Sequence, residues 1–235
     1  MSMLFERHIG HDGRSGFAIW RIDETEAELL SLLHDSATEA VVQRCAAQVA
    51  IFRNEGRRKE WLAVRVLLAL CLGCDKEIAY SSHGAPELTD HSLHISISHT
   101  RGFAALAWHQ KHSIGIDIEQ RTDKVLRVVS RFVNQKESEA LSHSGYHAPD
   151  GELILWTAKE ALYKTVNIPQ LDCQQQLTVC PPPAQVSDEE KLMTNSTTEG
   201  LFTAYCSETD ASYVLRYAFF PQYVLTIAEP IIEQE

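Results

Sequence analysis

The sequence predicts an α+β protein made of two pseudo-symmetric halves. In each half, segments with helical spacing of apolar residues are followed by strand-like segments. The chain has 235 residues, of which 44% are hydrophobic and 23% are charged, so it is long enough for two domains and too apolar for wholesale disorder. We therefore expect an N-terminal half at 1–114 and a C-terminal half at 115–235, with the boundary near Gly115.

The first half begins with a short strand, which we predict at 17–22. Residues 24–54 carry apolar side chains at helical spacing, and we interpret them as a helical stretch. Residues 57–72 have a wider apolar face, and Gly73 is placed to end that helix.

Glycine, proline and aspartate then interrupt 81–92, which predicts a loop. Residues 93–98 alternate between apolar and polar, as a half-buried strand does, and 103–108 form an apolar strand. The residues between them, 99–102, supply the turn of a hairpin.

The second half opens with a strand at 114–118. Three helices follow, at 125–132, 135–142 and 152–166. A polar loop is predicted from Pro181 to about Gly200. Three strands close the half, at 201–206, 213–219 and 223–227.

Composition excludes several classes of function. The chain carries 21 Lys and Arg against 32 Asp and Glu, a net charge of -11, which argues against general binding of nucleic acids or anionic membranes. Its longest apolar run, 62–72, is interrupted by Arg65 and is shorter than the roughly 20 residues that span a bilayer. The N-terminus lacks the apolar stretch of a signal peptide, and six scattered cysteines indicate a reduced, cytoplasmic setting.

Asp117 and Glu119 are the first candidate site residues. They are two apart on a predicted strand, so both side chains project from one face while Ile116 and Ile118 project from the other. Paired carboxylates repel unless a cation lies between them, and hard oxygen ligands of this kind suit Mg²⁺. Gly115 adds weight, because a strand glycine often permits the close approach of another group. The alternative interpretation is a solvated strand edge.

Glu160 and Lys164 are the second pair. They are four apart on a predicted helix and share one face, with Trp156 one turn earlier. A surface ion pair worth about 0.3–0.5 kcal/mol is the simpler interpretation. The functional one makes Glu160 a third carboxylate for a metal and places Lys164 where it neutralises phosphate charge.

Two further groups have the chemistry of phosphate binding. The first group is Ser98, His99 and Thr100, which end a strand with hydroxyl and imidazole groups. There are two alternative interpretations. One is a simple turn, and the other is a Ser/His nucleophile pair, although the usual Gly-x-Ser-x-Gly elbow is absent. Arg58 and Arg65 are seven apart, two turns along one helix face, so they are placed to grip a single phosphate, although a solvated basic face is the simpler interpretation.

In this order, five segments of the chain resemble the group II, surfactin-synthetase-activating type of 4′-phosphopantetheinyl transferase. They are R-K-E-W-L-A-V-R, S-I-S-H-T, G-I-D-I-E, R-F-V-N-Q-K-E and W-T-A-K-E-A-L-Y-K, and together they run from about Arg57 to Lys164. The resemblance implies the fold of that family, with coenzyme A bound in a cleft between the two halves and Mg²⁺ on its pyrophosphate. One departure is Ala85, where the family often has a lysine.

The resemblance also implies a role for each site residue. By this resemblance Asp117, Glu119 and Glu160 are the metal carboxylates, and Glu160 is also the general base, directly or through water. Pyrophosphate oxygens are held by Lys164, Ser98 and His99. The 3′-phosphate is bound by Arg58 and Arg65. The implied reaction moves phosphopantetheine from coenzyme A to a serine of an apo acyl or peptidyl carrier protein and releases 3′,5′-ADP. We expect a monomer.

Two other functions remain open from the residues alone. A binding module of the same ancestry would hold coenzyme A or the carrier without turnover. A two-carboxylate hydrolase is the other, but Asp117 and Glu119 on one strand would flank one point instead of opposite sides of a sugar.

Carrier proteins are typically acidic, so the net charge of the chain is a difficulty for the first function. The region from Arg121 to Glu137 is nevertheless basic, with five cationic residues against two acidic ones. Because the Debye length at physiological salt is about 8 Å, local patches govern docking more than the total charge. The resemblance implies that the carrier docks on this region.

Overall fold

The computed structural model describes residues 3–8, 15–181 and 198–232, and it confirms the predicted mixture of helices and antiparallel sheets. The chain forms two compact units, Met1–Lys111 and His112–Glu235, which are described one at a time. Among the described residues, no helix combines the length and the apolar character needed to cross a membrane.

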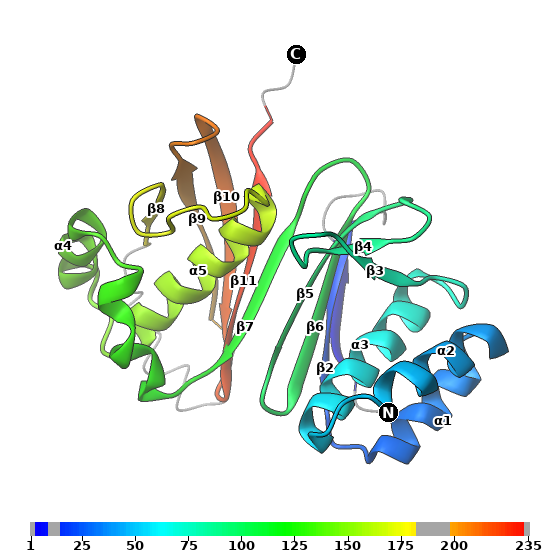
Figure 1. Ribbon diagram of the computed structural model, residues 1–235. Helices are drawn as coiled ribbons and strands as arrows, with labels where there is room; N and C mark the ends of the chain where they lie inside the picture. The colour runs from blue at the N-terminus through cyan, green and yellow to red at the C-terminus, as the bar shows by residue number, and fades with distance from the viewer. Residues whose placement is uncertain (1–2, 9–14, 182–197, 233–235) are drawn as a thin grey trace. The chain divides into compact units, whose positions relative to one another are not determined.

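The first unit is built on a four-stranded antiparallel sheet with strand order β1-β2-β6-β5 (Figure 1). Its strands are β1 (Met3–His8), β2 (Gly16–Arg21), β5 (His94–Thr100) and β6 (Phe103–His109). The first of them was not predicted. The predicted turn is shorter than expected, because β5 continues through Thr100 and the chain reverses at Arg101 and Gly102, where Gly102 has a φ of 83°.

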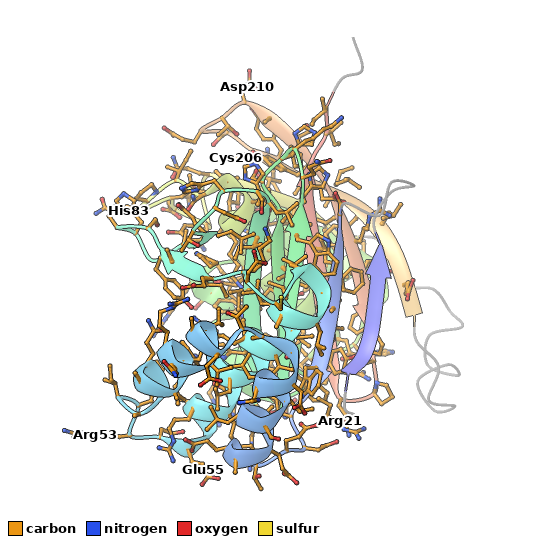
Figure 2. The ribbon with its side chains drawn as sticks, turned by 90° about the vertical axis from the view of Figure 1, so that its right-hand side faces the viewer. Arg21, Arg53, Glu55, His83, Cys206 and Asp210 are labelled. Carbon is orange, nitrogen blue, oxygen red and sulfur yellow. The ribbon has the colours of Figure 1, made fainter. Side chains whose placement is uncertain are left out.

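Helix α3 (Glu55–Leu72) packs on one face of this sheet, and α1 (Glu26–Ser36) and α2 (Glu39–Val49) pack against α3. The helical stretch predicted at 24–54 is divided in two because a second N-cap, Thr38, follows the end of α1 and accepts a hydrogen bond from the Val41 N–H at 3.4 Å. Helix α3 ends at Leu72 with Gly73 as its C-cap, as predicted. Figure 2 shows Arg53 and Glu55 projecting outwards where this helix begins.

A short hairpin extends into the loop predicted at 81–92, in which only residues 86–88 are strand. It pairs β3 (Ile78–Tyr80) with β4 (Pro86–Leu88), and backbone hydrogen bonds from Ser81 to Ala85 and from Gly84 to Ser81 close its turn. His83 lies at its tip (Figure 2). The strands are three residues each, too short for an alternating pattern to mark them in the sequence.

The second unit contains a five-stranded antiparallel sheet with strand order β7-β11-β10-β9-β8 (Figure 1). Its strands are β7 (Gly115–Gln120), β8 (Leu177–Cys180), β9 (Thr198–Cys206), β10 (Ala211–Phe219) and β11 (Tyr223–Pro230). Edge strand β8 was not predicted. Of the predicted polar loop, residues 182–197 lie outside the described part of the chain, and β9 already begins at Thr198.

Helix α5 (Asp150–Val166) packs on one face of this sheet, with α4 (Gln135–Ser144) beside β8. The helix predicted at 125–132 is instead two 3₁₀ turns, Asp123–Arg127 and Val129–Arg131. Their hydrogen bonds span three residues, as in the 3.0 Å bond from Val128 N–H to the Val125 carbonyl. Several β-branched valines in this segment disfavour a regular α-helix.

Candidate functional site

Gly115 brings strand β7 and helix α5 unusually close together. A Cβ atom built on Gly115 would lie 1.8 Å from the carbonyl oxygen of Ala161 and 2.4 Å from the hydroxyl of Thr165, both on α5. The group whose approach this glycine permits is therefore the helix that carries Glu160 and Lys164. Only glycine allows the backbone of the helix to lie this near the strand.

Asp117 is joined to α5 by an ion pair. Lys164 donates from Nζ to Asp117 Oδ1 at 2.8 Å and to the Ile116 carbonyl at 2.9 Å. Asp117 is 5% exposed, and it pairs across the sheet with Thr226, whose hydroxyl lies 2.8 Å from that of Thr157 on α5. Asp117 thus lies on the face of the sheet that α5 covers.

Glu119 projects from the same face of β7, two residues along. The indole Nε1–H of Trp156 donates to its Oε1 at 3.3 Å. The Trp156 ring in turn packs edge-on against Phe132, with ring centroids 5.0 Å apart. Sequence spacing placed Trp156 one turn from Glu160; its hydrogen bond to Glu119 is a role that the spacing did not reveal.

Glu160 completes a local concentration of negative charge. Burial raises the pKa of its carboxyl above the ordinary value, and the charge of Asp117 raises it further; the nearby Lys164 lowers the pKa and Glu119 raises it by smaller amounts. All three carboxylates therefore lie within electrostatic reach of one another, with Lys164 as the counter-charge on the same helix. Such an arrangement favours a bound cation.

His99 ends strand β5 in the other unit and contacts helix α3. Its Nδ1 lies 3.3 Å from Glu60 Oε2, and Arg57 Nη1 contacts its Nε2. Ser98, the preceding residue, is buried. The structure therefore brings His99 together with Arg57, a cation that sequence reasoning did not select.

The two selected arginines have no partner in common among the described contacts. Arg58 donates to Glu26 Oε2 at 2.6 Å and to the Phe52 carbonyl at 3.0 Å, which ties it to the start of α1 and the end of the α2–α3 connection. Arg65 is buried, lies over the Trp61 ring at 3.6 Å and donates to the Tyr80 hydroxyl at 3.3 Å.

Arg57, and not Arg58, is the arginine whose charge acts on Arg65. Burial lowers the pKa of Arg65, Tyr80 opposes that effect, and the positive charge of Arg57 adds to it. The two residues are eight apart, with Trp61 midway between them on α3. A helical repeat of 3.6 residues places residues seven apart closer to one face than residues eight apart, so the spacing favoured Arg58 and gave no reason to select Arg57.

The second unit is similar to a known family. Residues 113–227 match the sequence profile of the 4′-phosphopantetheinyl transferase superfamily. This segment, just under half of the chain, is similar to that superfamily. Among curated proteins, none matches the chain. The matched segment contains Asp117, Glu119, Glu160 and Lys164, whereas the arginines and His99 of the first unit lie outside it.

A divalent metal is expected in this superfamily. No group of three His, Cys, Asp or Glu side chains within the described ranges is arranged to hold a metal ion. This does not disfavour Mg²⁺, which usually takes one or two carboxylates and completes its octahedron with water and substrate phosphates. The carboxylates on β7 and α5 fit that requirement in chemistry and charge, so one or two of Asp117, Glu119 and Glu160 would hold the ion, with water and substrate phosphates as the other ligands.

Proposed function

We propose that this protein transfers 4′-phosphopantetheine from coenzyme A to a serine hydroxyl of an apo acyl or peptidyl carrier protein, releasing 3′,5′-ADP. The superfamily match supports phosphopantetheinyl transfer in general. The observation that carries the proposal is the joining of β7 and α5 at Gly115, which gathers three carboxylates and Lys164 on one face of the sheet.

The residues of this face divide the work of phosphoryl transfer. The serine oxygen attacks the β-phosphorus, the bond from that phosphorus to the leaving 3′,5′-ADP oxygen breaks, and Glu160 accepts the serine proton. Its raised pKa brings the carboxyl closer to the operating pH of a general base. Lys164 neutralises phosphate oxygens; because its Nζ is bonded to Asp117, the incoming diphosphate would compete for that ammonium group. A bound Mg²⁺ would neutralise charge on the diphosphate.

For the nucleotide end of coenzyme A we propose the residues of the first unit. His99 and Ser98 supply donors for pyrophosphate oxygens, and Arg65 supplies charge for the 3′-phosphate together with Arg58. The contacts of Arg57 with His99 favour adding this residue to the set. Ala85, where the family often has lysine, offers its backbone alone, and its N–H already donates to the Ser81 hydroxyl at 3.1 Å.

The direct test is incubation with coenzyme A, Mg²⁺ and a panel of apo-carriers. We expect a carrier to gain the mass of one phosphopantetheine group, and 3′,5′-ADP to appear in equal amount. Binding of coenzyme A with no mass gain on any carrier would favour the non-catalytic module. Hydrolytic activity that persists in the absence of Mg²⁺ would favour the two-carboxylate hydrolase.

We further propose that the carrier docks on the basic segment after β7. Arg127 and Arg131 are exposed there, beside the 38% exposed side chain of Leu126, a combination that suits an acidic helix with an apolar face. Arg121 contributes less, because it is paired with Asp150, its Nε lying 3.0 Å from Oδ1. The segment therefore offers a smaller patch than the count of basic residues suggests.

Reversing the charge of Arg127 and Arg131 to glutamate should raise the Michaelis constant for the carrier about tenfold, because complementary charges guide encounter and docking. The Michaelis constant for coenzyme A should stay unchanged. Steady-state kinetics with each substrate varied in turn measures both. Lys111→Glu with Arg216→Glu is the control, since it makes the same change in net charge elsewhere. Equal effects on both constants would count against the docking assignment.

A further inference from the structure

A fully buried ion pair joins helix α5 to the start of α4. The Lys159 ammonium lies 2.8 Å from Glu137 Oε2, and the two side chains are 2% and 0% exposed. Lys159 also donates to the carbonyls of Phe132 at 2.6 Å and Cys173 at 2.8 Å, so all three of its N–H donors have acceptors.

The carboxylate of Glu137 is equally well bound. Its Oε1 accepts from the Val179 N–H at 2.8 Å, and its Oε2 accepts from the Asn134 N–H at 2.9 Å as part of the α4 capping box. Burying two charges is expensive, and a pair of apolar residues would serve stability as well or better. A pair whose donors and acceptors are satisfied in this way instead fixes the places of its neighbours.

One of those neighbours leads directly to the candidate site. Lys159 holds the Phe132 carbonyl, the Phe132 ring packs edge-on against Trp156, and the Trp156 indole N–H bonds Glu119. Each step is a direct contact between described residues. The path begins at Lys159, which immediately precedes Glu160 in α5 and forms its ion pair with Glu137.

We propose that Lys159 and Glu137 are positioning residues, which fix Trp156 through Phe132 and thereby set the orientation of the Glu119 carboxylate. The consequence for catalysis rests on the proposed function, in which Glu119 helps to hold the metal and the diphosphate. The consequence for the geometry of Trp156 does not. Groups that orient metal-binding side chains typically affect affinity or activity 10–100-fold when they are removed.

The test is the Glu137→Gln variant of the full chain, because glutamine keeps the size of the side chain and one acceptor oxygen, while the charge and the second acceptor are lost. The chain has four tryptophans, so ¹⁵N-indole labelling gives four N–H resonances, and the Trp156→Phe variant identifies the one from Trp156. We expect Glu137→Gln to shift that resonance in the metal-free protein. With coenzyme A, Mg²⁺ and carrier, kcat should fall about 10–100-fold while the Michaelis constant for coenzyme A changes less than twofold.

Thr157→Val is the matched control. It removes a buried hydroxyl that bonds Thr226 and the Leu153 carbonyl on the same helix, at similar cost to stability, but it is not on the path to Trp156. It should leave the Trp156 resonance and kcat close to those of the wild type. If Glu137→Gln does not fold, the variant with both Glu137→Gln and Lys159→Gln, whose amides can bond each other, takes its place in the same measurements.

An unmoved Trp156 resonance in the folded variant would overturn the inference, and so would an equal loss of kcat in Thr157→Val. If Glu137→Gln shifts the Trp156 resonance but the wild-type protein transfers no phosphopantetheine, the proposed function would be refuted instead. In that case the positioning of Trp156 against Glu119 would stand on its own.

Discussion

Replacing Glu160 with glutamine should abolish transfer and at the same time raise the melting temperature of the metal-free protein. The carboxyl is half-buried near Asp117 and Glu119, so its ionised form is disfavoured and its pKa is raised. A neutral amide removes that repulsion. It also removes the proposed base and one proposed metal ligand, and loss of a general base typically lowers kcat about 10²–10⁴-fold.

The pH dependence follows from the direction of the pKa shift. Because the folded-state pKa of Glu160 lies above its unfolded value, folding favours the protonated carboxyl. The resulting stabilisation is fully present below the unfolded pKa and is lost as the pH rises through the folded one. The stability advantage of Glu160→Gln over the wild type should therefore be largest at neutral pH and disappear in acid.

Thermal unfolding in the presence of a chelator measures this effect. We expect a rise of about 2–4 °C for each kcal/mol gained, and a smaller difference once Mg²⁺ is added, since the ion neutralises the wild-type carboxylate. Glu152→Gln, the same change near the start of α5, is the control and should not raise the melting temperature. A Glu160→Gln protein with full turnover would assign the serine proton to a water instead of this carboxylate.

The second unit shows how much of the site could be predicted from sequence. Alternation along β7 placed Asp117 and Glu119 on one face, and the spacing in α5 placed Glu160 and Lys164 together; both are local properties of a single element. Gly115 was noticed for its freedom to admit another group. That the group is the Ala161 carbonyl on α5 depends on packing between elements 46 residues apart, which no local pattern contains.

The first unit shows where sequence reasoning fails. Residues 61–69 of α3 are buried all round, so helical periodicity cannot say which face Arg65 occupies or which arginine lies near it. The ion pairs of Arg58 with Glu26 and of Lys159 with Glu137 join residues 32 and 22 positions apart. Pairings of this kind are set by tertiary packing between distant segments, so no local pattern in the sequence contains them.

Gly115→Ala should strongly destabilise the second unit. The added Cβ would lie 1.8 Å from the Ala161 carbonyl oxygen and 2.4 Å from the Thr165 hydroxyl, well inside contact distance. Backbone cannot rotate out of the way as a side chain does, so β7 and α5 must separate. Overpacking typically costs about 1–3 kcal/mol, and a backbone clash belongs at or beyond the upper end of that range.

Separation of the two elements would also disrupt the candidate site. It would strain the bond from the Thr165 hydroxyl to the Ala228 carbonyl, now 3.1 Å, and the 2.8 Å ion pair of Lys164 with Asp117. A displacement of about 1 Å in a catalytic group can cost about 10²-fold in rate. We therefore expect Gly115→Ala to lower the melting temperature by roughly 5–10 °C and kcat by at least about 10²-fold.

Gly145→Ala separates these two effects, because it lies in the same unit but at the C-cap of α4, where its φ of 82° makes alanine unfavourable by about 1 kcal/mol. It should lower the melting temperature by about 2–4 °C and leave kcat unchanged at a temperature where the protein is folded. Thermal unfolding and transfer kinetics on the same preparations make the comparison. If Gly115→Ala behaved like Gly145→Ala, losing stability without losing turnover, the close contact of β7 with α5 would not be what holds the carboxylates and Lys164 in place.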